Sequence, residues 1–398
     1  MSFDLLQGLR VVEVSSFVAA PWAGLCLAQL GAQVTRIDPP GGGIDAGRWP
    51  LGPDGESLYW QGLNRGKRSV ALDLKSSDGQ AALHALLQEG GADGGILITN
   101  LTGPDWLTFE RLQEVRPDLV MVELRGNPNG SPAVDYTVNA ALGIPAMTGG
   151  ENDAPVNHTL PAWDGIAGAT LATAVLAALR KRDHTGQGQH ISVALSDVAT
   201  AFVGALGWIA EAELTGQDRP RHGNHLYGAF GHPLTSADGR RVMVIALTTR
   251  HFAALTRASD TPAAMEAVAD RTGQDLTTDA GRYLARAEIL DVLQAWASTL
   301  DFAALCATLE DAGALWGPYR TMTQWLAEDA NASSANPMMH TVEGIHHGAR
   351  ATGSPIRPSG AREVAPAPDR PIGADTQAVL DTLHLPAELK ARLKDNAR

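Results

Sequence analysis

The feature that most constrains the fold of this chain is an alternation of short β-branched runs and helical patterns along its first half. The pattern predicts a buried strand over residues 9–14, a helix over 20–30 and a second strand over 32–38. Pro21 lies in the first turn of that helix and Gly31 follows its end, and both residues suit these places at helix termini. A strand, a helix and a strand within about 30 residues indicate a βαβ unit and therefore a parallel sheet.

The same alternation continues along the chain. Strands are predicted over residues 69–74, 95–99 and 119–124, and long helices over 164–182 and 197–214. Strands that alternate with helices pack as a sheet covered by helices, so this part of the chain is predicted to have an α/β layer architecture.

The character of the sequence changes after a polar hinge at residues 216–221. A predicted strand over 240–247 is followed by a segment, 250–328, in which helical patterns dominate, and this combination predicts a smaller α+β domain. The Pro-rich tail over 354–371 is expected to be extended and to lead into two short helices.

Composition excludes several classes of protein. The 398 residues include 44 Asp and Glu against 31 Lys and Arg, so the formal net charge of −13 argues against a broad nucleic-acid surface. Hydrophobic residues make up 44% and charged residues 19% of the chain, which predicts a folded protein instead of a disordered one.

Cysteine usage and hydropathy indicate the compartment. Cys26 and Cys306 lie far apart and form neither a disulfide framework nor a metal-binding pair, which favours a reducing environment. No apolar run reaches the roughly 18 residues of a membrane span, and the N-terminus lacks the pattern of a secretory signal. We therefore expect a cytoplasmic protein that binds neither a membrane nor a nucleic acid.

The loop after the first predicted strand, residues 15–21, is where a dinucleotide-binding fold would carry its GxGxxG motif, and that motif is absent. Asp38, at the end of the second strand, imitates the ribose ligand of such folds. The alternative is that Asp38 is a surface residue at a strand end. Without the glycines, the sequence argues against an NAD site.

A dense cationic segment, NRGKRS, occupies residues 64–69. One interpretation is a solvated basic turn, which is the usual state of such a run. The other is a phosphate clamp, in which the lysine supplies a point charge and the arginines supply planar forks. Composition leaves the two interpretations open.

Asp164 is the most informative single residue, because it opens an alanine-rich helix. One interpretation is an N-cap carboxylate. The same position suits a carboxylate nucleophile, since the helix dipole and the backbone N–H groups keep the side chain ionised. The sequence pattern by itself favours the cap.

Residues 223–231, GNHLYGAFG, form a glycine-spaced segment between His222 and His232. This segment is either an ordinary loop between domains or a mobile flap whose N–H groups stabilise an oxyanion. The histidines lack the spacing of metal ligands, and the chain contains no GxSxG motif. Neither a metal site nor a serine nucleophile is therefore expected.

Taken together and in this order, these segments resemble the class III CoA-transferase family along nearly the whole chain. No single motif is decisive, but the ordered set is specific. The matching stretches are residues 9–14 with 20–21, 27–38, 64–75, 96–100, 135–143 with 164, and 177–195, followed by the glycine-spaced segment.

The resemblance implies an architecture. It implies a discontinuous, Rossmann-like large domain with a parallel sheet over residues 1–215 and 330–398, and a smaller α+β domain over 225–329. Linkers would cover residues 216–224 and about 330–353. In this family two chains interlock like links, so we expect an interlocked homodimer.

The resemblance also assigns roles to individual residues, beginning with Asp164 as the catalytic aspartate. The residues expected to contact coenzyme A are Val18, Ala19, Arg48, Leu63, Lys67, Asn100 and Leu101. The residues expected to hold the free carboxylate or to form the oxyanion loop are Tyr136, Asn139, His158, Gly223, His225 and Gly228, with Arg48 again a candidate. No metal is implied, and no cofactor beyond the CoA carried by the acyl-CoA substrate.

Within the family, residues 17–22, 41–50, 134–149, 156–164 and 223–231 are most similar to members that move CoA between the two carboxyl groups of one 2-methylfumarate (mesaconate) molecule. The implied route passes through an aspartyl anhydride and an aspartyl-CoA thioester. The alternative within the family is an intermolecular transferase acting on another dicarboxylic or short acyl-CoA. A nucleotide-dependent oxidoreductase and a CoA-binding protein without catalysis are the alternatives outside it.

The chain departs from the family pattern at three places. Residues 38–41, DPPG, stand where many relatives have Glu-Arg-Pro-Gly, so Arg36 or Arg48 is expected to replace the missing arginine. Residues 101–104, LTGP, differ from the usual Phe-Arg-Pro-Gly. Residues 133–135, AVD, stand where the racemases of the family have Gly-His-Asp, and the absent histidine argues against racemisation.

Overall fold

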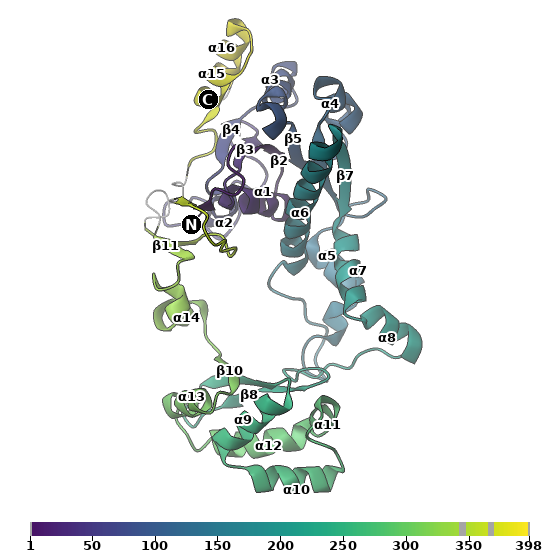
Figure 1. The fold of residues 1–398 in the computed structure, drawn as a ribbon, viewed down its shortest axis with the longest axis vertical. Helices are drawn as coiled ribbons and strands as arrows, with labels where there is room; N and C mark the ends of the chain where they lie inside the picture. Colours follow the sequence, from purple (N-terminus) through teal and green to yellow (C-terminus); the bar gives the residue numbers. More distant parts are fainter. Residues whose placement is uncertain (1, 342–347, 365–369, 397–398) are drawn as a thin grey trace. The chain divides into compact units, whose positions relative to one another are not determined.

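The computed structural model describes residues 2–341, 348–364 and 370–396 (Figure 1). The remaining positions include parts of two segments predicted from the sequence, the linker over 330–353 and the extended tail over 354–371, and those parts lie outside the described residues.

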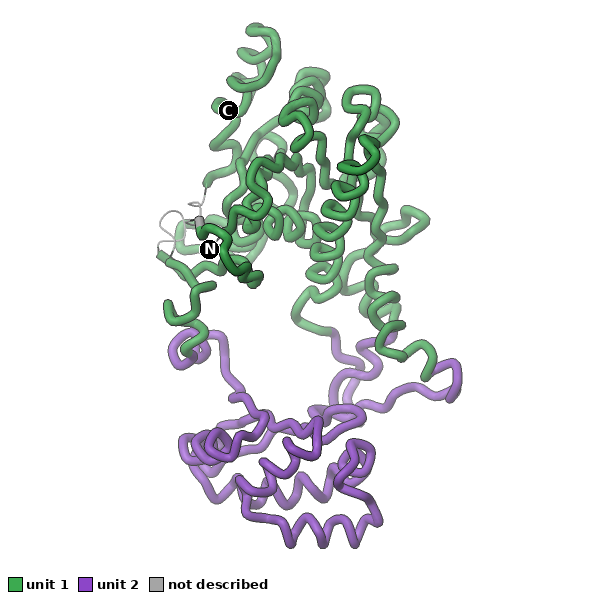
Figure 2. The backbone as a smooth tube through the Cα atoms, in the orientation of Figure 1, with its two compact units in different colours: residues 1–142, 158–211, 330–398 green, residues 143–157, 212–329 purple. Residues whose placement is uncertain are grey.

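The chain divides into two compact units (Figure 2). Unit 1 contains residues 1–142, 158–211 and 330–398, so both ends of the chain belong to it. Unit 2 contains residues 143–157 and 212–329. Residues 143–157 were assigned to the larger domain from the sequence, but in the structure they cluster with the smaller unit.

Unit 1 is built on a six-stranded sheet whose order is β4-β3-β2-β5-β6-β7. Every neighbouring pair is parallel. The strands are β2 (Arg10–Val14), β3 (Gln33–Asp38), β4 (Arg68–Ala71), β5 (Ile96–Thr99), β6 (Val120–Arg125) and β7 (Gln189–Ala194). The chain builds outward from β2 in one direction and then from β5 in the other, which is the Rossmann order, and the predicted α/β class is confirmed.

Strands β2 to β6 are mostly buried on both faces, as in other all-parallel sheets, whereas the edge strand β7 is partly exposed. Val12 and Val14 point to one face, where they share a hydrophobic core with helices α3 (Ser77–Gln88) and α4 (Phe109–Val115). Glu13 points to the opposite face, which α1 (Ala19–Gln29) and α6 (Ala162–Thr185) cover. The alternation of side chains along one strand thus separates an apolar layer from a layer that includes charge.

The remaining elements of unit 1 complete its edges. Close to the N-terminus, β1 pairs with β13 from the C-terminal segment, and Asp375 donates its backbone N–H to Ser69 O of β4. These elements are β1 (Ser2–Phe3), α2 (Leu58–Asn64), η1 (Gly91–Asp93), η2 (Asp105–Leu107), α5 (Asp135–Ala141), α7 (Leu195–Ala205), η4 (Ala330–Ala332), β11 (Met339–Thr341), β12 (Arg350–Thr352), β13 (Glu363–Val364), α15 (Thr376–Thr382) and α16 (Ala387–Asn396).

The prediction of one long helix over residues 197–214 is wrong in one respect, because the structure has two helices there. Helix α7 ends at Ala205, and α8 (Trp208–Thr215) begins three residues later. Gly207 lies between them with a φ of +78°. This left-handed conformation interrupts the helical hydrogen bonds and is accessible to glycine at little cost.

Helix α6 is the one described helix that is long and apolar enough to cross a membrane by length and composition alone. Two bent pairs of helices would raise that number to three if each pair were one span. In the structure, Leu171 and Val175 of α6 are fully buried, and the helix packs against α1 and β6. Because 44% of its apolar window is buried, packing within unit 1 accounts for part of its apolar character.

Unit 2 is a small α+β unit, as predicted. Its three-stranded antiparallel sheet has the order β10-β9-β8 and shares a hydrophobic core with the surrounding helices. Its elements are η3 (Ile144–Met147), β8 (Phe230–Thr235), β9 (Arg241–Ala246), α9 (Thr249–Ser259), α10 (Pro262–Thr272), α11 (Asp279–Leu284), α12 (Arg286–Ala297), α13 (Phe302–Asp311), β10 (Leu315–Pro318) and α14 (Met322–Glu328).

Candidate active site

A cavity of about 640 Å³ opens in unit 1 at the carboxyl ends of β2, β5 and β6. Strands β2 and β5 are the neighbours at which the sheet changes its direction of growth, and ligands of open α/β sheets bind at such a switch point. We call this cavity the Asp164 pocket. Its lining residues are Ser16, Phe17, Val18, Ala19, Arg48, Trp49, Tyr59, Asn100, Leu124, Arg125, Gly126, Ala133, Val134, Asp135, Tyr136, Pro161, Asp164 and Leu195.

Asp164 reaches this pocket from the first turn of α6 but does not cap the helix, so the N-cap interpretation is wrong. The N-cap is Pro161, which offers no side-chain hydrogen bond. Asp135 takes over the capping role from outside the helix, since its Oδ2 accepts the N–H groups of Trp163 at 2.7 Å and of Asp164 at 3.1 Å. Among the described residues none donates a hydrogen bond to the Asp164 carboxylate, which leaves its oxygens open to a ligand.

Asp135 is a residue of the pocket wall that was not predicted from the sequence. It lies at the start of α5 and is 1% exposed, and its second oxygen is 2.6 Å from His158 Nε2. One side chain thus fixes both the beginning of α6 and the segment that leads to it. In the sequence, the one signal for Asp135 was that it begins a segment matched to the family, between an apolar residue and a tyrosine.

The electrostatics of the pocket act on Asp164. Burial raises the pKa of this carboxyl to about 6, the negative charge of Asp135 contributes in the same direction, and the positive charge of Arg48 opposes the rise. The two causes that raise the pKa disfavour the ionised carboxylate, because burial removes water from it and Asp135 places a like charge beside it. Asp164 is therefore ionised at neutral pH and more basic than an ordinary aspartate.

Close packing between two helices brings Asp164 to the β2 loop. A Cβ at Gly168 of α6 would lie 2.6 Å from Ala19 O and 2.6 Å from Trp22 Cδ1 of α1. Only a glycine allows the two helices this approach. The consequence is that Asp164, one turn earlier, shares a cavity with Val18 and Ala19, two of the residues predicted to contact CoA.

The loop that follows β2 is held in an uncommon conformation. Phe17 has a φ of +66°, and its N–H donates to Asp45 Oδ2 at 2.9 Å. Ser16 donates its N–H to Asn100 Oδ1 and accepts a hydrogen bond from Asn100 Nδ2 at 2.8 Å. Asn100, predicted as a CoA contact, lines the pocket and also fixes this loop. Phe17 and Asp45 could not be found from the sequence, because nothing local marks a left-handed phenylalanine.

Arg48 enters the pocket between two aromatic rings. Its Cζ lies 5.5 Å from the ring centroid of Phe17 and 5.3 Å from that of Tyr59. Both distances are within the range of cation–π contacts. Of the two arginines proposed to replace the missing family arginine, Arg48 lines the pocket, while Arg36 is 1% exposed and surrounded by acidic side chains.

Several predicted site residues do not line the Asp164 pocket. Leu63 and Leu101 are absent from its wall, and Leu101 is 41% exposed. Asn139 is fully buried, and its Oδ1 accepts the indole N–H of Trp163 at 3.1 Å. His158 is also absent from the wall, and its Nε2 lies 2.6 Å from Asp135 Oδ1. Tyr136 lines the pocket and is 40% exposed.

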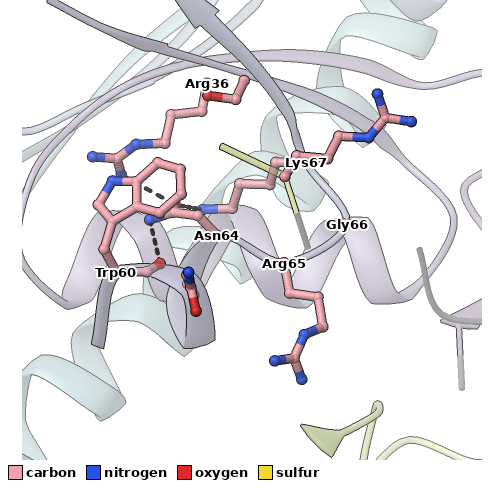
Figure 3. A pocket seen from close by; sticks show the side chains of 9 residues that line it. Arg36, Trp60, Asn64, Arg65, Gly66 and Lys67 are labelled. Carbon is pink, nitrogen blue, oxygen red and sulfur yellow. Dashed lines mark hydrogen bonds between the residues drawn. The ribbon is translucent and has the colours of Figure 1, made fainter. Parts of the chain in front are cut away.

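Lys67 is the clearest correction to the predicted phosphate clamp. Its ammonium is buried and donates to Glu13 Oε1, Pro21 O and Asn64 Oδ1 at 2.8 to 3.1 Å. Burial lowers the pKa of Lys67 to about 8. Figure 3 shows Lys67 and Arg36 converging on Asn64, while Arg65 extends in a different direction. The lysine of the NRGKRS segment is therefore an internal ion-pair partner.

Both interpretations of Asp38 are wrong, because its carboxylate is buried in an ion pair. It is 1% exposed, so it is not a surface residue, and its carboxylate binds the guanidinium of Arg36 at 2.8 Å. A ribose cannot reach a carboxylate that is enclosed by its own ion pair.

The predicted oxyanion loop belongs to unit 2. Gly223 and Gly228 have φ values of +59° and +77°, and Gly223 donates its N–H to Gly149 O at 2.9 Å. His225 packs against His232 with ring centroids 4.2 Å apart, and burial lowers the pKa of His225 to about 4. Its neutral imidazole is therefore not a cationic carboxylate ligand at neutral pH. In the part of the chain that the structure describes, no group of three or more metal-ligating side chains occurs.

Comparison with known proteins identifies close relatives of this arrangement. A family model described as CoA-transferase family III matches residues 6–376. The chain is 46% identical over 341 residues to 2-methylfumaryl-CoA isomerase from Chloroflexus aurantiacus, a match that covers 85% of this chain and 83% of that protein. It is 29% identical over 336 residues to succinyl-CoA–D-citramalate CoA-transferase from the same organism, covering 81% and 80% of the two chains.

Among solved structures, the chain matches the crystal structure of a CAIB/BAIF family protein from Brucella suis with a TM-score of 0.77. The match covers 96% of this chain and 99% of that chain at 24% sequence identity. At this level of identity the likeness shows the fold alone, and it agrees with the Rossmann-like sheet described above.

Proposed function

The chain belongs to CoA-transferase family III, and from that membership we propose that it catalyses an intramolecular CoA transfer. The proposed reaction converts 2-methylfumaryl-CoA, in which CoA is attached at C1 of mesaconate, to 3-methylfumaryl-CoA, in which it is attached at C4. The relative that is 46% identical carries the name of this isomerase, which supports the choice of substrate.

The observation that carries the proposal is the state of Asp164. Its carboxylate faces a cavity, receives no hydrogen bond from the described residues, and has a pKa raised to about 6 by burial and by Asp135. Such a carboxylate is ionised at neutral pH and poorly stabilised by its surroundings. This combination suits a nucleophile that attacks a thioester carbonyl.

The proposed chemistry balances without any added reagent. Asp164 attacks the C1 carbonyl, the C–S bond breaks, and an anhydride and a CoA thiolate result. The thiolate then attacks the Asp164 carbonyl of the anhydride, which gives an aspartyl-CoA thioester and releases mesaconate as a carboxylate. Mesaconate reorients, and its C4 carboxylate attacks the aspartyl-CoA thioester, which gives a second anhydride and the CoA thiolate. The thiolate then attacks the C4 carbonyl of this anhydride, which forms the product and regenerates the Asp164 carboxylate.

Retention of mesaconate between the two half-reactions would distinguish an isomerase from a transferase. A trapped acid has a large effective molarity, so external acids do not compete with it. We propose that the pocket excludes water during turnover, because water would hydrolyse the anhydride. Val18, Ala19 and Asn100, which line the pocket, are the proposed CoA contacts.

We further propose that the working unit is an interlocked homodimer in the cytoplasm that needs no metal. Phe202, Leu206 and Ile209 on one side of unit 1 are 46%, 49% and 41% exposed, an apolar surface that a second chain would cover. The mass of the protein in solution, measured by light scattering, tests this part of the proposal.

The decisive experiment supplies 2-methylfumaryl-CoA to the purified protein and follows the appearance of the C4 isomer by chromatography. Isotope-labelled free mesaconate and succinate are added during turnover. The proposal expects the isomer with almost no label in it. Substantial label would indicate an intermolecular transferase, and absence of any CoA adduct on Asp164 in quenched samples would indicate a CoA-binding protein without catalysis.

A further inference from the structure

We propose that Arg48 binds the free carboxylate of the acyl group and thereby selects dicarboxylic acyl-CoA substrates. The inference rests on the proposed function, because it requires an acyl group to be bound at Asp164. It goes beyond that function by naming the residue that recognises the substrate class and by explaining how the fold prepares it.

Two of the polar candidates for this role in unit 1 are already engaged. The hydroxyl of Tyr136 donates to Thr159 O at 3.2 Å. His158 is held at 2.6 Å by Asp135, so its nearest ligand is an acid of the protein. A substrate carboxylate would have to displace these contacts before either side chain could bind it.

The other two candidates are not placed to act. Asn139 is fully buried and accepts the indole N–H of Trp163, which orients its amide into the core. His225 belongs to unit 2, and its imidazole is neutral at neutral pH because burial lowers its pKa to about 4. Arg48 is the remaining candidate.

Arg48 offers donors that no protein group uses. Two arginines line the Asp164 pocket, and Arg125 donates to Glu123 Oε2 at 2.8 Å. The guanidinium of Arg48 makes neither a hydrogen bond nor an ion pair with any described residue. A guanidinium with open N–H groups is a bidentate ligand for a carboxylate.

The two aromatic rings explain how Arg48 stays in place without a polar partner. Phe17 and Tyr59 contact the guanidinium through their π-systems at 5.5 and 5.3 Å. A contact of this kind uses the positive charge and leaves the N–H groups free for hydrogen bonds. The donors are therefore preorganised instead of being consumed by a salt bridge.

The backbone under Phe17 makes this arrangement rigid. Phe17 adopts a φ of +66°, an unfavourable conformation for a side chain of its size. Asp45, which is 1% exposed, accepts the N–H of Phe17, and Asn100 holds Ser16 on the other side of it. Strain that is maintained by buried partners is typical of ligand-binding sites.

The charges in the pocket show why a dicarboxylic substrate needs this residue. The pocket already contains the carboxylates of Asp135 and Asp164, so a second carboxylate on the acyl group would be repelled. Arg48 lies close enough to Asp164 for its charge to act on that carboxyl. It can therefore offset the charge of the substrate, and an acyl group that ends in a methyl gains nothing from it.

The test compares two substrates that differ only in this group. They are 2-methylfumaryl-CoA and E-2-methylcrotonyl-CoA, in which a methyl replaces the free carboxylate. Both substrates form the same aspartyl-CoA thioester on Asp164 when their acid leaves the anhydride. The initial rate of formation of this adduct is measured by quenched flow and intact-protein mass spectrometry. Wild type, Arg48→Gln, Arg48→Lys and the exposed control Arg111→Gln are compared at pH 8, well above the pKa of about 6 of Asp164.

The proposal expects wild type and Arg111→Gln to favour the dicarboxylic substrate. Arg48→Gln is expected to lower the rate with 2-methylfumaryl-CoA by about 10- to 100-fold and to change the rate with E-2-methylcrotonyl-CoA less than threefold. Arg48→Lys is expected to restore only part of the preference, because it lacks the planar fork. Equal losses with both substrates, or a wild type without preference, would overturn the role of Arg48 while leaving the proposed function intact. No adduct with either substrate in wild type would instead refute the proposed function.

Phe17 is expected to be a positioning residue for Arg48. Phe17→Leu removes the ring and should lower the preference for the dicarboxylic substrate about 3- to 10-fold, mainly through KM. Phe17→Tyr keeps the ring and should retain the preference. A general loss of folding would change both substrates alike, so an unchanged ratio in Phe17→Leu would contradict this role.

Discussion

Two groups of charged side chains in unit 1 differ in what surrounds them. The first, which we call the Glu13 cluster, consists of Glu13, Arg36, Asp38, Asp45 and Lys67, each at most 4% exposed. Its cations are held by its anions, with contacts such as Lys67 Nζ to Glu13 Oε2 at 2.9 Å. The second is the Asp164 pocket, where the carboxylate of Asp164 and the guanidinium of Arg48 have no hydrogen-bonded partner among the described residues.

The difference shows which charges of this fold are paired in its interior and which are open to a ligand. Charges that are paired in the interior stabilise one arrangement, because removing either partner leaves an uncompensated charge. Charges that face a cavity without partners destabilise the free protein slightly and become available to a substrate. The same residue types are thus paired with one another in the Glu13 cluster and left open to a ligand in the Asp164 pocket.

The largest expected effect comes from the pocket. Asp164→Asn should lower isomerase activity by about 10⁴-fold or more, as for other lost nucleophiles. The same change should raise the free energy of unfolding at pH 8 by on the order of 1–3 kcal/mol, because a pKa raised to about 6 means that folding disfavours the ionised form. This penalty grows as pH rises from the unfolded value of 3.8 to about 6 and is fully present above it.

Activity is measured with 2-methylfumaryl-CoA and stability by urea unfolding. The matched control is Asp197→Asn, an exposed aspartate in the first turn of α7 that does not line the pocket. It should change neither quantity appreciably. Near-normal turnover in folded Asp164→Asn would contradict the nucleophile.

The next largest effect is expected in the Glu13 cluster. Glu13→Gln leaves Lys67 and Arg36 with less compensating charge and should lower the free energy of unfolding by about 3–5 kcal/mol. Chemical denaturation measures this loss. Glu114→Gln, in an ion pair that is about two-thirds exposed on both sides, should change stability by roughly 0.5 kcal/mol or less. Equal effects of the two variants would show that the cluster is no more important than a surface pair.

A smaller effect is expected where α6 meets α1. Gly168→Ala places a methyl 2.6 Å from Ala19 O and should destabilise the protein by about 1–3 kcal/mol. Gly165→Ala, in the same helix with nothing within 4 Å, should instead stabilise it by about 0.5–1 kcal/mol. Thermal unfolding of both variants checks the opposite signs, and two changes of the same sign would refute the close-packing argument.

The smallest expected effect is a shift in pH dependence. Because Asp164 must be ionised to attack, kcat/KM should fall about tenfold per pH unit below its pKa of about 6. Asp135→Asn removes the negative charge that raises this pKa, so the acidic limb should move to lower pH. A pH–rate profile of both proteins measures the shift. A limb that stays in place would mean that burial alone sets the pKa.

Much of the fold could be predicted from the sequence because its information is local. The period of apolar residues predicts the strands over 9–14 and 32–38, and the structure has β2 and β3 there. Helix α6 was also found, although it begins two residues before Asp164. The break between α7 and α8 was missed, because a single glycine within an apolar run does not by itself end a helix.

The site was harder to predict because each error concerned a partner distant in sequence. A phosphate clamp was one of two interpretations of the segment with Lys67, and the resemblance gave Lys67 a CoA contact, but its partner Glu13 is 54 residues away. Asp164 was interpreted as a cap, but Asp135, 29 residues earlier, supplies the cap. The resemblance to the family predicted a catalytic role for Asp164, whereas local patterns favoured the cap that the structure contradicts.

By itself, the sequence determined the α/β class, the succession of strands and helices, and the family to which the chain belongs. These depend on periodicity and on the order of short motifs, which are properties of neighbouring residues. The tertiary structure alone decided which charges are neutralised and which remain open, so that Lys67 became internal and Arg48 faces the pocket. The physical reason is that a charge is neutralised only when an opposite charge lies beside it in space. Strands that are neighbours in the sheet come from distant parts of the chain, so the sequence does not show which charges will meet.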